Sequence, residues 1–125
     1  MKDKEKRLLV IDSARKIQHL LNDKRTSEAL DIAEQYANGK ATDSDLMTAL
    51  QIAQIAGVKA SADWDGEYIN EFSDRFFASM MVFAACVKDS NKALSMSYDA
   101  IISAIDGLHY GANPTGYVSK FTLLK

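Results

Sequence analysis

The sequence predicts an all-α fold: a single-domain antiparallel bundle of about five helices, with a hydrophobic central helix at about residues 66–88 and an irregular C-terminal tail. Three observations support this prediction. Apolar residues recur every three or four positions through most of the chain, no two segments alternate as paired strands do, and residues 76–87 contain a single polar side chain. The length of 125 residues fits one domain spanning 1–125.

The first predicted helix runs from Asp3 to Leu21. Its apolar stripe consists of Val10, Ala14, Ile17 and Leu21, which are spaced by four, three and four residues. This spacing places the four side chains on one face of a helix, and we expect that face to point into the core.

The second predicted helix runs from Thr26, which can cap its N-terminus, to Ala37, and Gly39 supplies its C-terminal stop. The third begins with the clearest cap in the chain, because the hydroxyl of Thr42 precedes two acids that suit a first turn. Its apolar positions keep helical spacing up to Gly57, where we expect it to end.

The fourth predicted helix is the central one. From Phe76 onward it is apolar all round, a pattern typical of a helix that is covered on every side. The fifth follows a break at residues 89–91 and weakens at Gly107. We expect residues 112–125 to form a tail that is strapped onto the bundle or partly flexible.

Charge is distributed unevenly, although the net charge is only −2. Residues 1–25 hold eight Lys and Arg against four Asp and Glu, whereas residues 26–75 hold three against ten. Solvated helix faces are the simplest explanation, and a charged partner is the other. The isoelectric point of about 5.6 and the acids interleaved with the basic N-terminus argue against a nucleic-acid partner.

We expect a cytoplasmic protein with no membrane association. The apolar run after the charged N-terminus is interrupted by Asp12 and Arg15, unlike a signal peptide. The most apolar window, residues 76–87, would extend about 18 Å as a helix, short of the ~30 Å hydrocarbon core of a bilayer. The lone cysteine, Cys86, lies in this window and is expected to be a buried, inert thiol.

One segment carries a resemblance to a known family. The residues are Leu20-Leu21-x-Asp23-x-Arg25, followed by Ala33-Glu34-x-Tyr36-Ala37-x-Gly39. This pattern resembles an uncharacterised family of small helical proteins of bacteria and phages, and more loosely it is similar to candidate immunity proteins of toxin systems. The similarity is limited to about residues 15–57. It implies a helical fold and, at most, an antagonist or immunity role, since that family has no established reaction.

The nearest approach to a functional site is the acidic segment Asp63-Trp64-Asp65-Gly66-Glu67-Tyr68, with two further acids at 71 and 74. A solvated helix start explains such a run most simply. Alternatively, Asp63, Trp64, Asp65, Glu67 and Tyr68 contact a basic protein partner, with Trp64 as the aromatic anchor. A divalent cation is the third possibility, although the segment lacks the calcium-loop pattern.

No catalytic, cofactor-binding or metal-binding residue is predicted. His19 and His109 are the only histidines, and neither has a nucleophile at a recognisable spacing. The glycines at 107, 111 and 116 end a helix, whereas a phosphate-binding loop opens one.

These observations favour a non-enzymatic module that binds an unidentified protein partner, with the antagonist or immunity role as its most specific form. A small-molecule- or metal-binding helical protein, including an enzyme of unrecognised type, is the first alternative. A homo-oligomeric structural module, paired through the fifth helix or the tail, is the second.

Overall fold

The computed structural model describes the backbone of residues 2–18, 21, 23–62 and 69–106, and the side chains of these ranges except 60–62, 69–76 and 102–106. Five helices account for almost all of them: α1 (Asp3–Ile17), α2 (Lys24–Ala37), α3 (Asp43–Ala62), α4 (Ile69–Ala85) and α5 (Ser90–Asp106). The described ranges contain no strand. The all-α prediction is confirmed.

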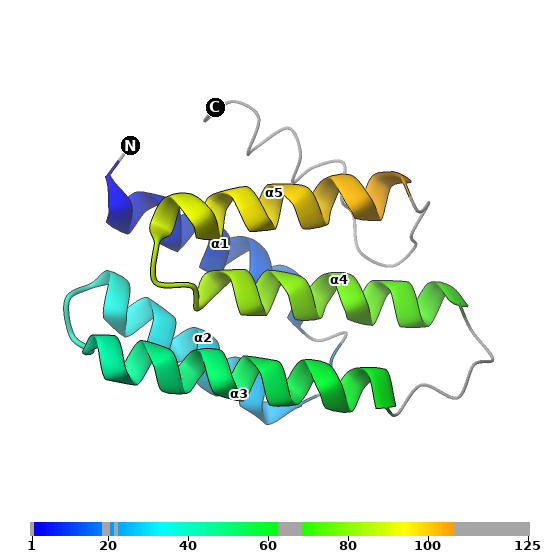
Figure 1. Ribbon diagram of the computed structural model, residues 1–125, viewed down its shortest axis with the longest axis horizontal. Coiled ribbons are helices and arrows are strands. Elements are labelled where there is room, and N and C mark those ends of the chain that lie inside the picture. The colour runs from blue at the N-terminus through cyan, green and yellow to red at the C-terminus, as the bar shows by residue number, and fades with distance from the viewer. Residues whose placement is uncertain (1, 19–20, 22, 63–68, 107–125) are drawn as a thin grey trace.

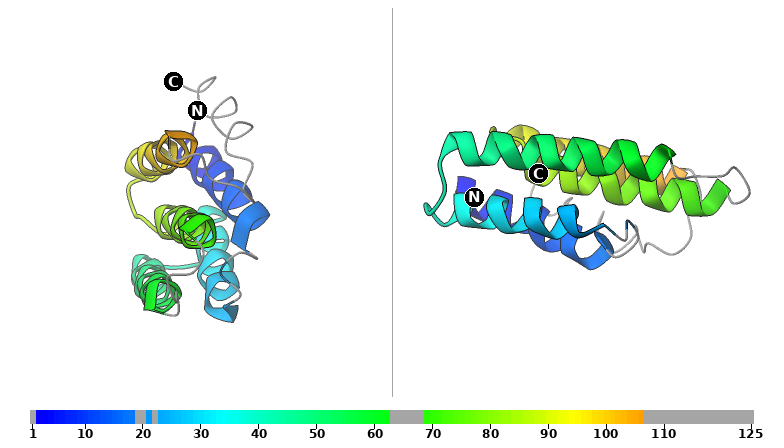
Figure 2. Two further views of the ribbon diagram at one scale, coloured as in Figure 1. Left: turned by 90° about the vertical axis from the view of Figure 1, so that its right-hand side faces the viewer. Right: turned by 90° about the horizontal axis from the view of Figure 1, so that it is seen from below.

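The helices pack in two layers (Figures 1 and 2). Helices α3, α4 and α5 lie side by side in one layer, and α1 and α2 form the other. Helices that follow one another in the chain run antiparallel, as the sequence predicts for a bundle. Helix α4 contacts all four other helices and is therefore the central element. Its Met80 and Phe83 are nevertheless only half-buried, so the prediction that it is covered on every side fails at its outer face.

The predicted inward face of α1 is buried. Val10, Ala14 and Ile17 of α1 are at most 3% exposed. Small side chains line the packed sides of α2 and α3, where Ala33 and Ala49 are fully buried. The backbones of these two helices can therefore approach closely.

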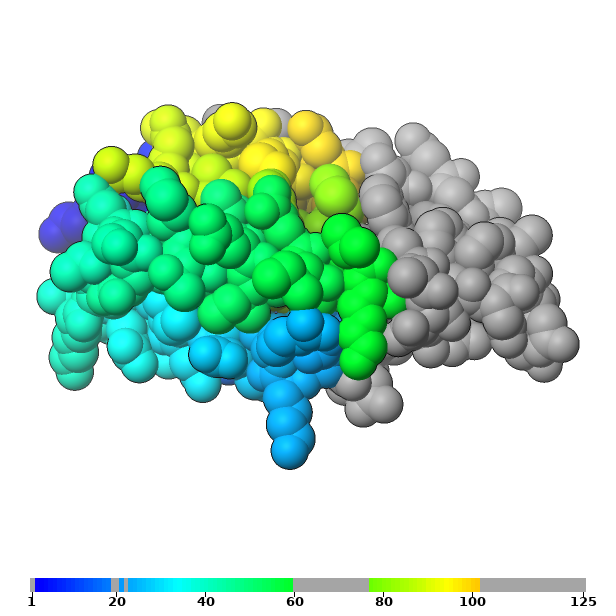
Figure 3. All heavy atoms as spheres, turned by 60° about the horizontal axis from the view of Figure 1, so that its bottom comes forward, coloured from blue at the N-terminus to red at the C-terminus, as the bar shows by residue number. Residues whose placement is uncertain are grey.

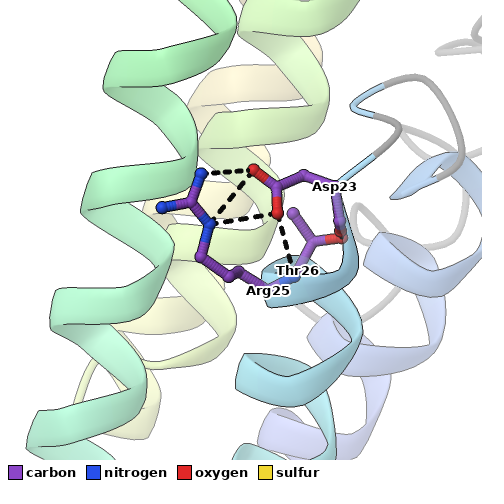
Figure 4. Close-up of polar contacts among 3 residues, drawn as sticks. All are labelled: Asp23, Arg25 and Thr26. Atoms are coloured by element: carbon purple, nitrogen blue, oxygen red, sulfur yellow. Dashed lines mark hydrogen bonds and ion pairs between the residues drawn. The ribbon is translucent and has the colours of Figure 1, made fainter.

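The junction between α1 and α2 differs from the prediction. Helix α1 ends at Ile17, one turn early, and a backbone hydrogen bond from Leu21 to Gln18 tightens the chain there. Helix α2 begins at Lys24 and not at Thr26, because the cap is Asp23 (Figure 4). The Asp23 carboxylate accepts from the Arg25 backbone N–H at 3.0 Å.

Thr26 has a different role from the predicted one. Its hydroxyl donates to the backbone oxygen of Asp23 at 2.7 Å, inside the first turn of α2. At the other end of α2 the prediction is confirmed, because Gly39 has a φ of +75° and its N–H bonds Tyr36 O at 3.1 Å. Together with the Lys40 N–H to Gln35 O bond, this forms a Schellman motif.

Helix α3 starts as predicted and ends later than predicted. Thr42 Oγ1 accepts from the Asp45 N–H at 3.1 Å, and the Asp45 carboxylate accepts from the Thr42 N–H at 2.9 Å, which is a reciprocal capping box. The expected end at Gly57 is wrong, since the helix continues to Ala62. Gly57 instead faces Ser79 of α4, where a β-carbon would collide with the serine hydroxyl.

Helix α4 ends at Ala85, three residues before the predicted end of the central helix. Short-range backbone bonds at Cys86 and Val87 turn the chain, and the Asp89 carboxylate then accepts from two N–H groups at the start of α5. The predicted tail, residues 112–125, lies outside the described residues.

Candidate functional site

The predicted contact segment cannot be placed in the fold. Asp63, Trp64, Asp65, Glu67 and Tyr68 all lie outside the described residues. Their place in the chain is nonetheless informative, because they follow directly after α3 ends at Ala62.

Helix α3 lies at the edge of its layer and packs on α2 and α4. Its inward side chains, Leu46, Ala49, Ala53 and Ala56, are at most 3% exposed. The opposite side of this helix is where a soluble bundle ordinarily places charged residues.

Large apolar side chains occupy that opposite side instead. Met47 is 64% exposed, Ile55 is 53% exposed and Val58 is 70% exposed. Among the side chains that the structure describes, these are the only exposed large apolar ones, and all three belong to α3. A local concentration of this kind is typical of an interaction surface, whereas isolated exposed apolar residues are ordinary.

These three side chains lie in one row along the helix, together with the exposed polar residues Ser44 and Gln51. Ser44, Met47, Gln51, Ile55 and Val58 follow one another at intervals of three, four, four and three residues, close to the 3.6-residue period of an α-helix. We call these five residues the α3 line. Figure 3 shows the outer face of α3 in green across this side of the molecule, and no other described helix lies over it.

A hollow of about 320 Å³ adjoins the α3 line at the seam between α3 and the end of α4. Most of its lining is apolar and comes from Leu46, Met47, Leu50 and Cys86. The polar residues Asp43, Ser44 and Lys88 form the rest of the lining. Burial raises the pKa of the Cys86 thiol to about 12, so this group stays neutral and unreactive at physiological pH. The hollow is chemically suited to hold an apolar side chain.

A second, polar hollow of about 540 Å³ lies at the same end of the bundle, between α1, the end of α2 and the α4–α5 turn. Its central group is Arg7, which is only 3% exposed. The Arg7 guanidinium donates to Ala85 O at 2.8 Å and to Lys88 O at 2.6 Å, and it lies 5.1 Å from the Tyr36 ring centre. Burial lowers the pKa of Arg7 from its usual value.

Other polar groups at this end bond to one another. Tyr36 donates its hydroxyl proton to Asp43 at 2.7 Å, and Lys88 pairs with the same carboxylate at 3.1 Å. These two partners hold the pKa of Asp43 below its usual value. Ser90 donates to Asp3 at 2.7 Å. These bonds around the polar hollow therefore connect the ends of the helices.

His19 and His109 both lie outside the described residues, and Cys86 is buried. Within the described residues, no group of three or more His, Cys, Asp or Glu side chains could hold a metal ion. None of the described helices is long and apolar enough to cross a membrane.

Sequence reasoning missed the α3 line for an identifiable reason. Ending the helix at Gly57 left Val58 outside it, so the row lost its C-terminal member. Met47 and Ile55, eight residues apart with Gln51 between them, were the available signal.

Comparison with known proteins returns no match: no family model, no curated protein and no solved structure is similar to this chain. The surface of the bundle is therefore the basis for any functional assignment.

Proposed function

We propose that this chain is a non-enzymatic protein-interaction module that works through the α3 line. The observation that carries this proposal is the exposure of Met47, Ile55 and Val58 in one row on an edge helix. Covering apolar surface is favourable by about 25 cal/mol per Å², so a partner that packs on this row gains binding energy at Met47, Ile55 and Val58. The adjoining hollow supports the proposal, because buried anchor side chains in pockets dominate the energy of many interfaces.

The more specific form of the proposal is an antagonist or immunity role in a bacterial or phage setting. It rests on the resemblance of residues 15–57 to that class of helical proteins. In this form, Asp63, Trp64, Asp65, Glu67 and Tyr68 extend the contact beyond the end of α3, and their acids select a partner with basic residues.

The proposal is tested by measuring partner binding with four variants of the full chain. Ile55→Glu places a charge in the α3 line, and Trp64→Ala and Glu67→Lys alter the acidic segment. Gln35→Glu is the matched control, because it adds the same charge as Ile55→Glu at an exposed position of α2. A protein that is captured by the wild-type chain is identified, purified and titrated against each variant.

We expect Ile55→Glu to weaken binding of the purified partner at least tenfold and Gln35→Glu to leave it unchanged, because only the first buries a charge in the contact. Equal affinity of the Ile55→Glu and wild-type chains would remove the α3 line as the binding surface. If Trp64→Ala and Glu67→Lys lose binding while Ile55→Glu keeps it, the binding site is the acidic segment. If both Trp64→Ala and Glu67→Lys bind as the wild type does, the acidic segment is excluded.

A further inference from the structure

The exposed side of α3 carries no charge between the two ends of the helix. Residues 46–58 include no Asp, Glu, Lys or Arg, in a chain of which 26% of the residues are charged. The nearest charges along the helix are Asp45 before this run and Lys59 after it. The exposed side chains of the run are apolar or neutral, and we call them the neutral face: Met47, Thr48, Gln51, Gln54, Ile55 and Val58.

The other described helices differ in this respect. Charged side chains are exposed on each of α1, α2 and α5, for example at Lys4, Asp31 and Asp99. In α4, none of the described side chains, residues 77–85, is exposed. Among the side chains that the structure describes, the neutral face is therefore the longest exposed stretch of helix without a charge.

The absence of charge limits what can bind to the neutral face. A charged side chain of a partner would meet no opposite charge there, and covering an unpaired charge is costly. Nucleic acids and anionic lipid surfaces are bound through Lys and Arg side chains, which the neutral face lacks. The complementary surface is therefore apolar and uncharged, as the core of a protein interface commonly is.

The backbone of α3 favours a partner that is itself helical. The N–H and C=O groups of a helix bond to one another, so residues 46–58 offer only side chains to a partner. An extended segment covered against this face would leave the backbone groups that point toward α3 without hydrogen-bond partners, which is costly. A helix satisfies these groups internally, so the apolar side of an amphipathic helix can be covered without that cost.

The dimensions of the neutral face set the length of the contact. From Met47 to Val58 the helix rises about 16 Å, or roughly three turns. The apolar hollow adjoins Met47 at one end of this length, and its volume of about 320 Å³ admits a large apolar side chain. A partner that fits presents apolar side chains along the whole length, with a bulky one at the end that meets the hollow.

From these observations we infer that the α3 line binds an amphipathic helix of another protein, whose contacting face is apolar and uncharged. The inference rests on the proposed function, since it names the class of partner for the same surface. Two properties follow from the uncharged contact. Binding changes little with salt, because salt screens only charges. A charge placed on the contacting face of either helix weakens binding.

The test uses a synthetic helical peptide of about 14 residues, nearly four turns, as the probe. Leucine occupies one face of this neutral peptide, and alanine and glutamine occupy the rest. Two further peptides carry a glutamate or a lysine at the centre of the leucine face, and a scrambled peptide has the neutral composition without the leucine face. Each peptide is titrated into the full, isotope-labelled chain, and the amide shifts locate the site and give the affinity.

We expect the neutral peptide to bind the wild-type chain with a dissociation constant below about 1 mM and to shift the amides of residues 46–58. Ile55→Glu should weaken this binding at least tenfold, whereas Gln35→Glu, which adds the same charge on α2, should leave it unchanged. The glutamate and lysine peptides should each bind the wild-type chain at least tenfold more weakly than the neutral peptide. Raising the salt from about 50 mM to about 500 mM should change the affinity for the neutral peptide less than about twofold.

Several results would overturn the inference. Absence of saturable binding up to about 1 mM, or shifts centred outside α3, excludes an amphipathic helix at this face. Equal affinity of the scrambled peptide means that no apolar helix face is recognised, and a charged peptide that binds as tightly as the neutral one contradicts the uncharged contact. If the α3 amides shift only with phosphatidylcholine vesicles, or only with rising chain concentration, the occupant is a lipid surface or a second copy.

These outcomes separate the inference from the proposed function. If the peptide does not bind but Ile55→Glu still weakens a purified protein partner, the α3 line remains an interaction surface for a partner of different chemistry. If the peptide binds α3 as expected while Ile55→Glu leaves the protein partner unaffected, the helix-binding face remains and that partner binds elsewhere.

Discussion

Arg7 connects three helices at one end of the bundle. It belongs to α1, its guanidinium bonds the oxygen of Ala85 at the end of α4 and that of Lys88 just beyond, and it lies over the Tyr36 ring of α2. The last carbonyl groups of a helix have no partner within that helix. Arg7 supplies the missing donors from a neighbouring element, in a place that water barely reaches.

We expect Arg7→Met to lower the free energy of unfolding by roughly 2–4 kcal/mol, because it leaves buried carbonyl oxygens unpaired. Arg15→Met on the same helix is the matched control, since Arg15 pairs with Asp31 and Glu34 at the surface. It should cost less than about 1 kcal/mol and lose most of that effect at high salt. Urea unfolding of both variants measures the difference, and equal losses would contradict the structural role of Arg7.

At the scale of helices, the start of α2 depends on the ionisation of one cap. The Arg25 guanidinium donates to Asp23 at 2.8 Å, and this bond is the main cause that holds the pKa of Asp23 below its ordinary value of 3.8 (Figure 4). A depressed folded-state pKa means that ionised Asp23 stabilises the fold. This stabilisation is complete above the unfolded-state pKa and is lost as the pH falls through the folded-state value.

Two variants separate the cap from its charge. Asp23→Ala should lower stability at pH 7 by about 1 kcal/mol, as expected for loss of an N-cap. Asp23→Asn keeps a capping oxygen but cannot ionise, so its deficit relative to wild type should shrink below about pH 4 and vanish once Asp23 is protonated. Urea unfolding between pH 2 and pH 7, a range that spans the carboxyl titration, measures this. A deficit independent of pH would contradict the ionised cap.

Gly57 lies inside α3, where the sequence had suggested a helix end, and its substitution tests the close contact with Ser79. In a helix interior glycine is less favourable than alanine by roughly 0.5–1 kcal/mol. Here a β-carbon would collide with the Ser79 hydroxyl but would lie 3.7 Å from the Ser79 β-carbon, an ordinary contact. Gly57→Ala should therefore raise stability by about 0.5–1 kcal/mol in a Ser79→Ala background and by less in the wild-type background. Thermal unfolding of the four proteins checks this, and equal gains in both backgrounds would exclude the close approach.

The helices show which structural features could be predicted from the sequence and which could not. The hydrophobic period predicted all five helices. The caps at Thr42 and Gly39 could be predicted as well, because both act on backbone groups that are close by in the chain. Gly57 lies inside α3 and faces Ser79, which is 22 residues distant in the chain, so a local rule that reads glycine as a helix end failed there. The α3 line needed one more fact, namely that α3 lies at the edge of its layer, and only packing determines that.

At the scale of the whole molecule, one helix packs against all the others. Helix α4 contacts α1, α2, α3 and α5, whereas α3 packs on α2 and α4 at the edge of its layer. The apolar run at 76–87 predicted a central element without revealing its neighbours. Because α3 is an edge helix, its outer face is available to a partner without any rearrangement of the core.

This layering predicts an order of local stability that native-state hydrogen exchange can measure. Opening α4 separates it from all four neighbours, so the amides of Phe77–Ala85 should exchange only through global unfolding, with a free energy equal to that from urea. The amides of α3 should exchange with a lower free energy, because detaching an edge helix leaves α4 packed on α1, α2 and α5. Exchange of α4 amides well below the global free energy would mean that α4 is not the element on which the bundle depends.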